Sequence, residues 1–199
     1  MPRRPSRKQL ILETLARELE RRPAGRITTA NLASAAGVSE AALYRHFDGK
    51  AGMFESLIEF AERSIFDRVQ KILDEERQAR SRCAKLLYLL LGFAELNPGI
   101  TRVLLGDMLV GEGELPRTRV EGFHQRFEEQ LRQVLEAAPL RESSQPPLGA
   151  AGAANLLMTL VEGRMHRFLR SGFAQSPLEG WDAEWSSLSR CLFLLEAAT

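Results

Sequence analysis

The stretch from Thr28 to Lys50 concentrates hydroxyl groups, cations and small side chains. Hydroxyls and cations donate hydrogen bonds to phosphate oxygens, and small side chains allow close approach to base edges and thymine methyl groups. The positions concerned are Thr28, Thr29, Ser39, Glu40, Ala41, Ala42, Tyr44, Arg45, His46 and Lys50. Glu40 is the oddity, because its carboxylate repels phosphate unless it accepts from a cytosine amine or faces away. The stretch predicts a surface that binds duplex DNA.

Two short helices around a tight turn would present these groups. Thr28 and Ser39 each stand where a helix begins, and their side-chain oxygens can accept from free backbone N–H groups there. Gly37 stands where the first helix must stop, because glycine takes the left-handed conformation without a Cβ clash. The inward-facing positions are Leu32, Ala33, Leu43 and Phe47. This order of caps, turn and apolar spacing predicts a helix-turn-helix whose second helix enters the major groove by its N-terminal end.

The charge distribution points to the same end of the chain. Residues 1–50 hold 10 lysines and arginines against 5 acidic residues, a net charge of +5, whereas the remaining 149 residues hold 17 against 21, a net charge of −4. Such a basic head on a neutral or acidic body is typical of DNA-binding proteins. Arg3, Arg4, Arg7 and Lys8 lie within residues 1–8, which hold no acid. This segment is either an arm that adds phosphate or minor-groove contacts, or a solvated tail, and the sequence leaves both open.

The rest of the chain reads as helices joined by short loops. Apolar residues at three- and four-residue spacing predict helices over 9–21, 50–76, 83–96, 100–110, 116–138, 150–170 and 185–197. Residues 75–82 are predicted as a charged connector, and the helix over 83–96 is predicted to be buried because it is apolar almost all round. We expect an all-α protein with a helix-turn-helix domain over residues 1–53 and a helical regulatory and dimerisation domain over 54–199. The small residues at 150–155 and the apolar faces of the last two helices favour a homodimer, which suits a palindromic DNA site.

No residue pattern of an enzyme or a cofactor site stands out. Glu162 and His166 share a helix face at metal-like spacing, but two ligands favour a surface pair over a metal site. Cys83 and Cys191 lie in apolar helical contexts, which predicts buried thiols in a reducing compartment. No apolar run reaches the length of about 18 residues that spans a membrane, and the N-terminus lacks a signal-peptide core. We expect a cytoplasmic binding protein without a metal, a cofactor or a membrane partner.

Phe60 does not share the inner face of its helix. At about 100° per residue it lies well round the helix from Phe54, Ala61 and Ile65. Packing against a neighbouring helix explains such a position, and so does an exposed aromatic anchor for a partner protein.

The helix-turn-helix resembles that of the TetR family. The match includes the turn Gly37-Val38-Ser39, the run Tyr44-Arg45-His46-Phe47, and Lys50 at the start of the next helix. Four segments are similar to those of the nucleoid-occlusion factors, the TetR-family division inhibitors of proteobacteria: RITTANLASAAGVSEAALYRHF, MFESLIEFAERSI, LLLGFAELNPGITRVLLGDML and FEEQLRQVL. The likeness covers roughly residues 9–138 and, more loosely, 150–190.

This resemblance implies a dual function and a place at the nucleoid. Such proteins bind palindromic chromosomal sites. While bound to DNA, they engage the acidic C-terminal tail of the tubulin-like division GTPase FtsZ and antagonise Z-ring assembly over unsegregated DNA. The tail-binding residues of the family, carried over by position, are Phe60, Arg68, Leu89, Gly92 and Asn97. The resemblance therefore favours the partner role for Phe60.

Two positions depart from the family pattern. Leu96 stands where the family tends to have an arginine, which removes one charge contact, and Asp48 stands where proline is usual. The competing interpretation is a TetR-type repressor that a small apolar ligand, bound among residues 86–96, releases from its operator. Binding of an FtsZ-tail peptide distinguishes the two interpretations.

Overall fold

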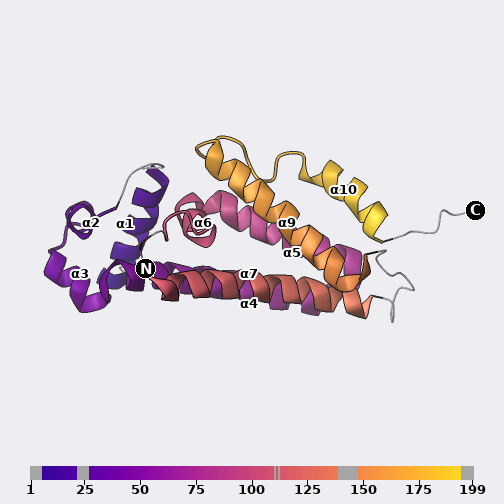
Figure 1. Cartoon of the computed structure of the whole chain (residues 1–199), viewed down its shortest axis with the longest axis horizontal. Helices are drawn as coiled ribbons and strands as arrows, with labels where there is room; N and C mark the ends of the chain where they lie inside the picture. The colour runs from indigo at the N-terminus through magenta and orange to yellow at the C-terminus, as the bar shows by residue number, and fades with distance from the viewer. Residues whose placement is uncertain (1–5, 22–26, 110, 112, 139–147, 194–199) are drawn as a thin grey trace, which may run out of the picture. The chain divides into compact units, whose positions relative to one another are not determined.

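The computed structural model of the chain describes residues 6–21, 27–109, 111, 113–138 and 148–193. Regular structure in these residues is helical throughout, which confirms the predicted all-α class (Figure 1). In chain order, with the labels of Figure 1, the helices are α1 (Arg7–Arg21), α2 (Thr29–Ala36), α3 (Glu40–His46), α4 (Gly49–Glu75), α5 (Ala79–Leu96), α6 (Pro98–Leu104), α7 (Glu114–Ala137), α9 (Gly149–Arg170) and α10 (Trp181–Leu192). The basic residues Arg3 and Arg4 of the predicted arm lie outside the described residues.

The helices form two compact units. The N-terminal unit comprises Met1–Glu62 and Asn97–Glu121, and the C-terminal unit comprises Arg63–Leu96 and Gly122–Thr199. The long helices α4 and α7 contribute residues to both units.

The N-terminal unit is built around α1, which packs against α2 and α6. Ile11, Leu15 and Leu19 of α1 are fully buried, because they follow one helical stripe. Gly99 of α6 approaches α1 so closely that a Cβ atom there would lie 2.0 Å from the carbonyl oxygen of Ala16. Only glycine allows this approach.

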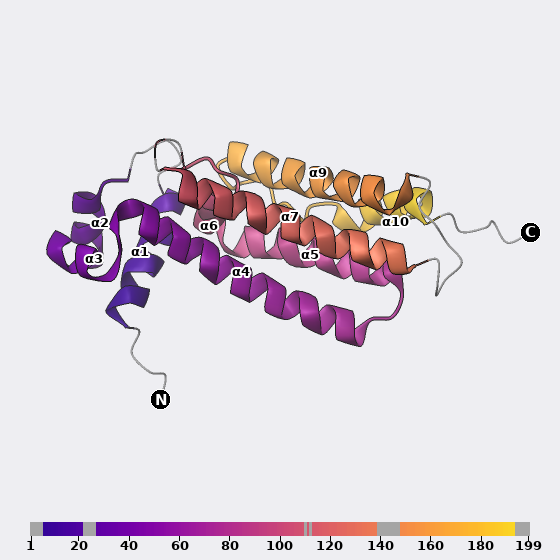
Figure 2. The same ribbon diagram turned by 60° about the horizontal axis from the view of Figure 1, so that its bottom comes forward.

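The C-terminal unit has α5 at its centre, with α9 running across it (Figures 1 and 2). Leu86, Leu87, Leu90 and Leu91 on the inner side of α5 are fully buried. In the same unit α4 and α7 lie side by side, and the ring of Phe66 meets Phe123 edge-on at 5.8 Å (Figure 2).

Several predicted helix boundaries were wrong. Helix α5 begins at Ala79, so part of the predicted charged connector is helical. The guanidinium of Arg82 donates to the carbonyls of Glu76 at 2.7 Å and Leu73 at 2.6 Å, which satisfies backbone acceptors where α4 ends. Helix α6 ends at Leu104 rather than at 110, and α7 begins at Glu114 rather than at 116.

The last helix also differs from the prediction. Helix α10 spans Trp181–Leu192, so it begins four residues before the predicted start at 185, after Gly180 in the left-handed conformation. The predicted end at 197 lies outside the described residues. Cys83 is buried as expected, but Cys191 is exposed, because it faces away from the side of α10 that carries Trp181, Trp185 and Leu192.

The prediction that α5 is buried all round was also wrong. One stripe of this helix reaches the surface, with Tyr88 53% exposed and Leu96 79% exposed. Within the described residues no single helix is long and apolar enough to cross a membrane, and α5 and α6 reach that composition only when counted together across their bend.

Candidate DNA interface and helical groove

The helix-turn-helix has the predicted caps and turn. The side-chain oxygen of Thr28 accepts from the backbone N–H of Asn31 at 3.2 Å, and that of Ser39 accepts from Ala42 N–H at 3.3 Å. Gly37 ends α2 in the left-handed conformation, with φ 64° and ψ 35°. These contacts fix where α2 and α3 begin, and they set the direction in which α3 presents its first turn.

The two alanines of that first turn do not share one environment. Ala41 is exposed, as a groove contact requires. Ala42 is only 3% exposed, so the expectation that it touches DNA was wrong. Successive side chains of a helix point about 100° apart, so Ala41 can face solvent while Ala42 and Leu43 form the buried side of α3.

Glu40 has a partner inside the protein. The hydroxyl of Thr29 donates to Glu40 Oε2 at 3.0 Å, and the hydroxyl of Tyr44 donates to Thr29 Oγ1 at 3.5 Å. The carboxylate is therefore held beside α2, which accounts for an acidic residue among the candidate DNA contacts. Tyr44 is 57% exposed, so its ring stays available at the surface.

The cations of this unit divide into exposed and engaged groups. Arg45 and His46 are exposed at the end of α3. Lys50 is half-buried, and its ammonium donates to the carbonyl of Ile27 at 3.3 Å and lies 5.6 Å from the centre of the Phe54 ring. Lys50 thus joins the start of α4 to the residues before α2, a role that the sequence did not indicate.

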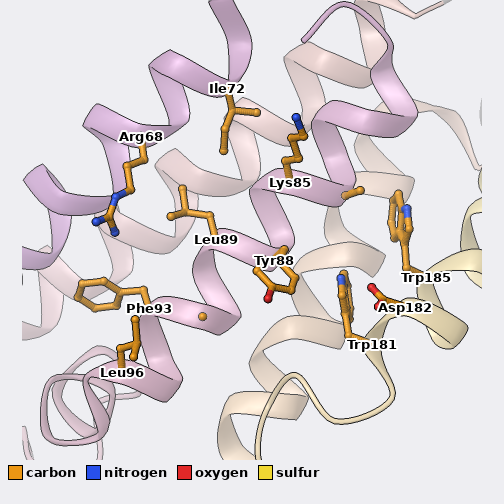
Figure 3. Close-up of a pocket in the computed structure, with 12 residues that line it drawn as sticks. Arg68, Ile72, Lys85, Tyr88, Leu89, Phe93, Leu96, Trp181, Asp182 and Trp185 are labelled. Atoms are coloured by element: carbon orange, nitrogen blue, oxygen red, sulfur yellow. The ribbon is translucent and has the colours of Figure 1, made fainter. Parts of the chain in front are cut away.

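A groove of about 540 Å³ lies on the C-terminal unit, open to solvent (Figure 3). Its lining comes from α4, α5 and α10. The α4–α5 limb of the groove carries Arg68, Ile72, Leu89, Phe93 and Leu96, the α5–α10 limb carries Lys85, Tyr88, Trp181, Asp182 and Trp185, and Ala84 and Gly92 complete the lining.

Three of the five residues that the resemblance assigned to tail binding line this groove: Arg68, Leu89 and Gly92. A Cβ atom at Gly92 would meet only Leu178 Cδ1, at 3.9 Å, so the packing of the protein does not require glycine there. The other two, Phe60 and Asn97, belong to the N-terminal unit. Phe60 is 46% exposed, so it does not lie buried against a neighbouring helix.

Sequence reasoning missed the α5–α10 limb. The signal was present on α5, where Lys85, Tyr88, Gly92 and Leu96 follow one another at three- and four-residue spacing on one outer stripe. Trp181 and Trp185 are only 3% and 9% exposed, and a tryptophan pair at helical spacing first suggests core packing.

Charges are unevenly satisfied along the groove. Lys85 pairs with Glu76, and the hydrogen bond from Lys85 is the main cause that holds the pKa of Glu76 below its usual range. Arg68, by contrast, has no ion pair within the part of the chain that the structure describes. The α4–α5 limb therefore offers a cation beside an apolar floor.

Glu162 was expected to form a surface pair with His166, and its nearest partner is different. His124 Nδ1 of α7 lies 3.4 Å from Glu162 Oε1, and this contact, with a smaller contribution from the charge of His166, holds the pKa of Glu162 below its usual range. Among the described residues no group of three or more ligating side chains could hold a metal ion.

Comparison with known proteins decides the family. A model described as bacterial regulatory proteins, tetR family, matches residues 11–57, and a SlmA-like model described as tetracyclin repressor-like, C-terminal domain, matches residues 77–193. "Nucleoid occlusion factor SlmA" of Shewanella amazonensis is 50% identical over 94% of this chain and 95% of its own length. The protein of the same name from Alteromonas mediterranea is 48% identical over 93% and 95%. The chain belongs to the SlmA family of nucleoid occlusion factors.

Membership confirms the resemblance seen in the sequence, and it makes this chain a DNA-binding regulator rather than an enzyme. Solved structures confirm the TetR-like fold at much lower identity. The MbdR regulator from Azoarcus sp. CIB superposes with a TM-score of 0.79 at 19% identity, covering 94% of this chain and 100% of that chain. FadR from Bacillus subtilis, solved with stearoyl-CoA, gives 0.77 at 12% identity, covering 92% and 98%.

Proposed function

We propose that this chain acts at the nucleoid as a homodimer that binds palindromic DNA with one α3 helix per half-site. The exposed positions Tyr44, Arg45 and His46 are placed for phosphate contacts, and Ala41 for base contacts. Thr28 and Ser39 fix the two helices that carry these positions. A single helix-turn-helix reads only a few base pairs, so a symmetric pair is the expected way to gain affinity.

The exposed face of α9 supports the homodimer. Gly152, Thr159 and Gly163 lie on this face with Leu156, whose side chain is 40% exposed. Small residues let two helices approach closely, and the central leucine offers apolar area to a copy of itself across a two-fold axis. The dimer would therefore form through this exposed face of α9.

The DNA-bound dimer, in this proposal, binds the acidic C-terminal tail of FtsZ in the α4–α5 limb and thereby antagonises Z-ring assembly over the nucleoid. The observation that carries the proposal is that Arg68, Leu89 and Gly92, which the family resemblance selects, line one groove. Arg68 provides a cation for a tail carboxylate, and Leu89 provides apolar floor. The parts assigned to Phe60 and Asn97 rest on the family resemblance, and for Phe60 also on its exposed ring.

The test is a titration of the full-length protein with a fluorescein-labelled FtsZ-tail peptide, with and without saturating palindromic duplex. We expect peptide binding that is tighter with the duplex, and we expect Arg68→Ala and Phe60→Ala to weaken it at least tenfold. Leu115→Ala is the matched control, because Leu115 is 72% exposed and lies outside the groove. Absence of peptide binding, together with a small apolar effector that releases DNA, would instead establish a ligand-responsive repressor.

A further inference from the structure

The groove does not end at the residues that the family resemblance selects. It continues across α5 onto the α5–α10 limb, where Tyr88 stands on the side of α5 that faces Trp181, Asp182 and Trp185 (Figure 3). All the residues of this limb belong to the C-terminal unit. The limb is therefore part of the same surface as the α4–α5 limb.

The aromatic residues of the α5–α10 limb offer indole N–H groups and an exposed phenol ring to a ligand. The rings of Trp181 and Trp185 stack at 6.0 Å, and the guanidinium of Arg164 lies 5.5 Å from the centre of the Trp181 ring. Within the described residues neither indole N–H donates to a protein acceptor, and neither nitrogen is enclosed without a partner. Both N–H groups are thus open to an acceptor from outside, such as a peptide carbonyl, while the exposed Tyr88 ring offers apolar contact area.

The two limbs differ in charge. Arg68 on the α4–α5 limb and Asp182 on the α5–α10 limb have no ion pair within the described part of the chain, whereas Lys85, on the same limb as Asp182, is paired with Glu76. A complementary ligand therefore carries a negative charge at one end and a positive charge at the other, with apolar groups between.

The groove extends along α5 as well as across it, which leaves room for a short peptide. Lys85 and Leu96, which lie towards its two ends on α5, are separated by 11 positions. At a rise of about 1.5 Å per helical residue this spans about 16 Å, the length of roughly five extended residues.

We propose that the α5–α10 limb is a second subsite for the acidic tail that the proposed function places in the α4–α5 limb, and the inference rests on that function. A carboxylate of the tail pairs with Arg68, and an apolar side chain packs on Tyr88. A lysine or arginine of the tail then pairs with Asp182, and the open indole N–H groups donate to a backbone carbonyl of the tail. Tyr88, Trp181 and Asp182 thereby select among acidic tails by requiring an apolar residue and a basic residue in this order.

The experiment uses the full-length protein with saturating palindromic duplex and two labelled peptides. One is the FtsZ C-terminal tail, and the other is the same tail with glutamine in place of its lysines and arginines. The variants are Tyr88→Ala and Asp182→Asn, whose side chains are exposed, with Leu115→Ala as the control. Trp181 is left unchanged, because its buried ring contributes to the fold.

We expect Tyr88→Ala to weaken binding of the unmodified tail at least tenfold, and Leu115→Ala to leave it unchanged. Asp182→Asn should weaken the unmodified tail several-fold and leave the glutamine-substituted tail unaffected, which is the signature of one direct pair. Wild-type affinity in both Tyr88→Ala and Asp182→Asn, with Arg68→Ala still impaired, overturns the second subsite and leaves the proposed function standing. No binding of the tail to the wild-type protein overturns both.

Discussion

Two glycines in neighbouring helices, Gly92 and Gly99, mark opposite kinds of surroundings. Gly99 in the N-terminal unit faces the backbone of α1, where an added Cβ would lie 2.0 Å from Ala16 O and 3.1 Å from Leu19 Cβ. Gly92 in the C-terminal unit lines the groove, where an added Cβ would meet one side-chain atom at 3.9 Å. The packing of α6 against α1 therefore requires glycine at position 99, whereas the packing of the C-terminal unit does not require glycine at position 92, which lines an open groove.

The packed region is also locked by a buried cation. Arg102 is only 2% exposed. Its guanidinium donates to the carbonyl of Leu19 at 2.8 Å and to the carboxylate of Asp107 at 2.9 Å. Contact between α1 and α6 is therefore specified by sterics and by hydrogen bonds together. The groove, in contrast, carries the guanidinium of Arg68 and the carboxylate of Asp182, neither of which has an ion pair within the described residues, and such groups are what a binding surface needs.

Gly99→Ala should give the largest effect on stability. The clash involves backbone on both sides, so one helix must move, and we expect the free energy of unfolding to fall by about 3 kcal/mol or more. Chemical denaturation followed by circular dichroism measures the change. Gly122→Ala is the control, because nothing lies within 4 Å of its added Cβ and it sits within α7. This change should stabilise the protein by about 0.5–1 kcal/mol, and equal midpoints for the two variants would contradict the assignment.

Tyr44 and Tyr88, the two tyrosines of the chain, give the next largest effect and separate the two regions by function. Both are exposed, at 57% and 53%, so alanine should change the free energy of unfolding little at either position. Tyr44→Ala should weaken DNA binding by about 1–3 kcal/mol and leave tail binding at saturating DNA unchanged. Tyr88→Ala should leave the affinity for DNA unchanged. Fluorescence anisotropy with a labelled duplex measures the DNA affinity of both variants. A loss of DNA affinity in Tyr88→Ala would contradict the assignment of DNA binding and tail binding to different regions.

Thr28→Ala should weaken DNA binding by a similar amount, about 1–3 kcal/mol. It should also lower the free energy of unfolding by about 1 kcal/mol, because Thr28 caps α2. The protein nevertheless remains folded, and comparison with Tyr44→Ala separates the cap from the DNA contact. Wild-type DNA affinity in Thr28→Ala and Tyr44→Ala together would remove these positions from the interface.

The local features of the N-terminal unit could be predicted from the sequence because neighbouring residues determine them. The caps at Thr28 and Ser39 and the left-handed Gly37 each satisfy backbone groups within three or four positions along the chain. The charged residues Arg80 and Arg82 were wrongly predicted to lie in a connector, because the start of α5 depends on hydrogen bonds from Arg82 to the end of α4. A carbonyl nine positions away leaves no periodic signal.

The groove could be predicted only in part, for a related reason. Periodicity shows that α5 is apolar almost all round, but which stripe stays exposed depends on the helices that cover the others. Ala42 was misplaced by the same ambiguity, because its burial depends on how α3 packs against α2. The outward stripe of α5 indicates a surface there, but it does not indicate where α10 lies, so the contribution of Trp181 and Trp185 to the lining could not be predicted.

Gly92→Ala should give the smallest change in stability and the sharpest test of the comparison. Alanine favours a helix interior over glycine by about 0.5–1 kcal/mol, and the nearest atom to the new methyl, Leu178 Cδ1 at 3.9 Å, is at ordinary contact distance. The free energy of unfolding should therefore rise slightly.

Affinity of Gly92→Ala for the tail peptide should fall, because the methyl occupies space in the groove where the peptide backbone passes. Gly122→Ala should be stabilised to the same degree and keep its peptide affinity. Full peptide affinity in Gly92→Ala would mean that the tail does not approach α5 at this position, and a loss of stability would mean that this glycine, like Gly99, serves the fold.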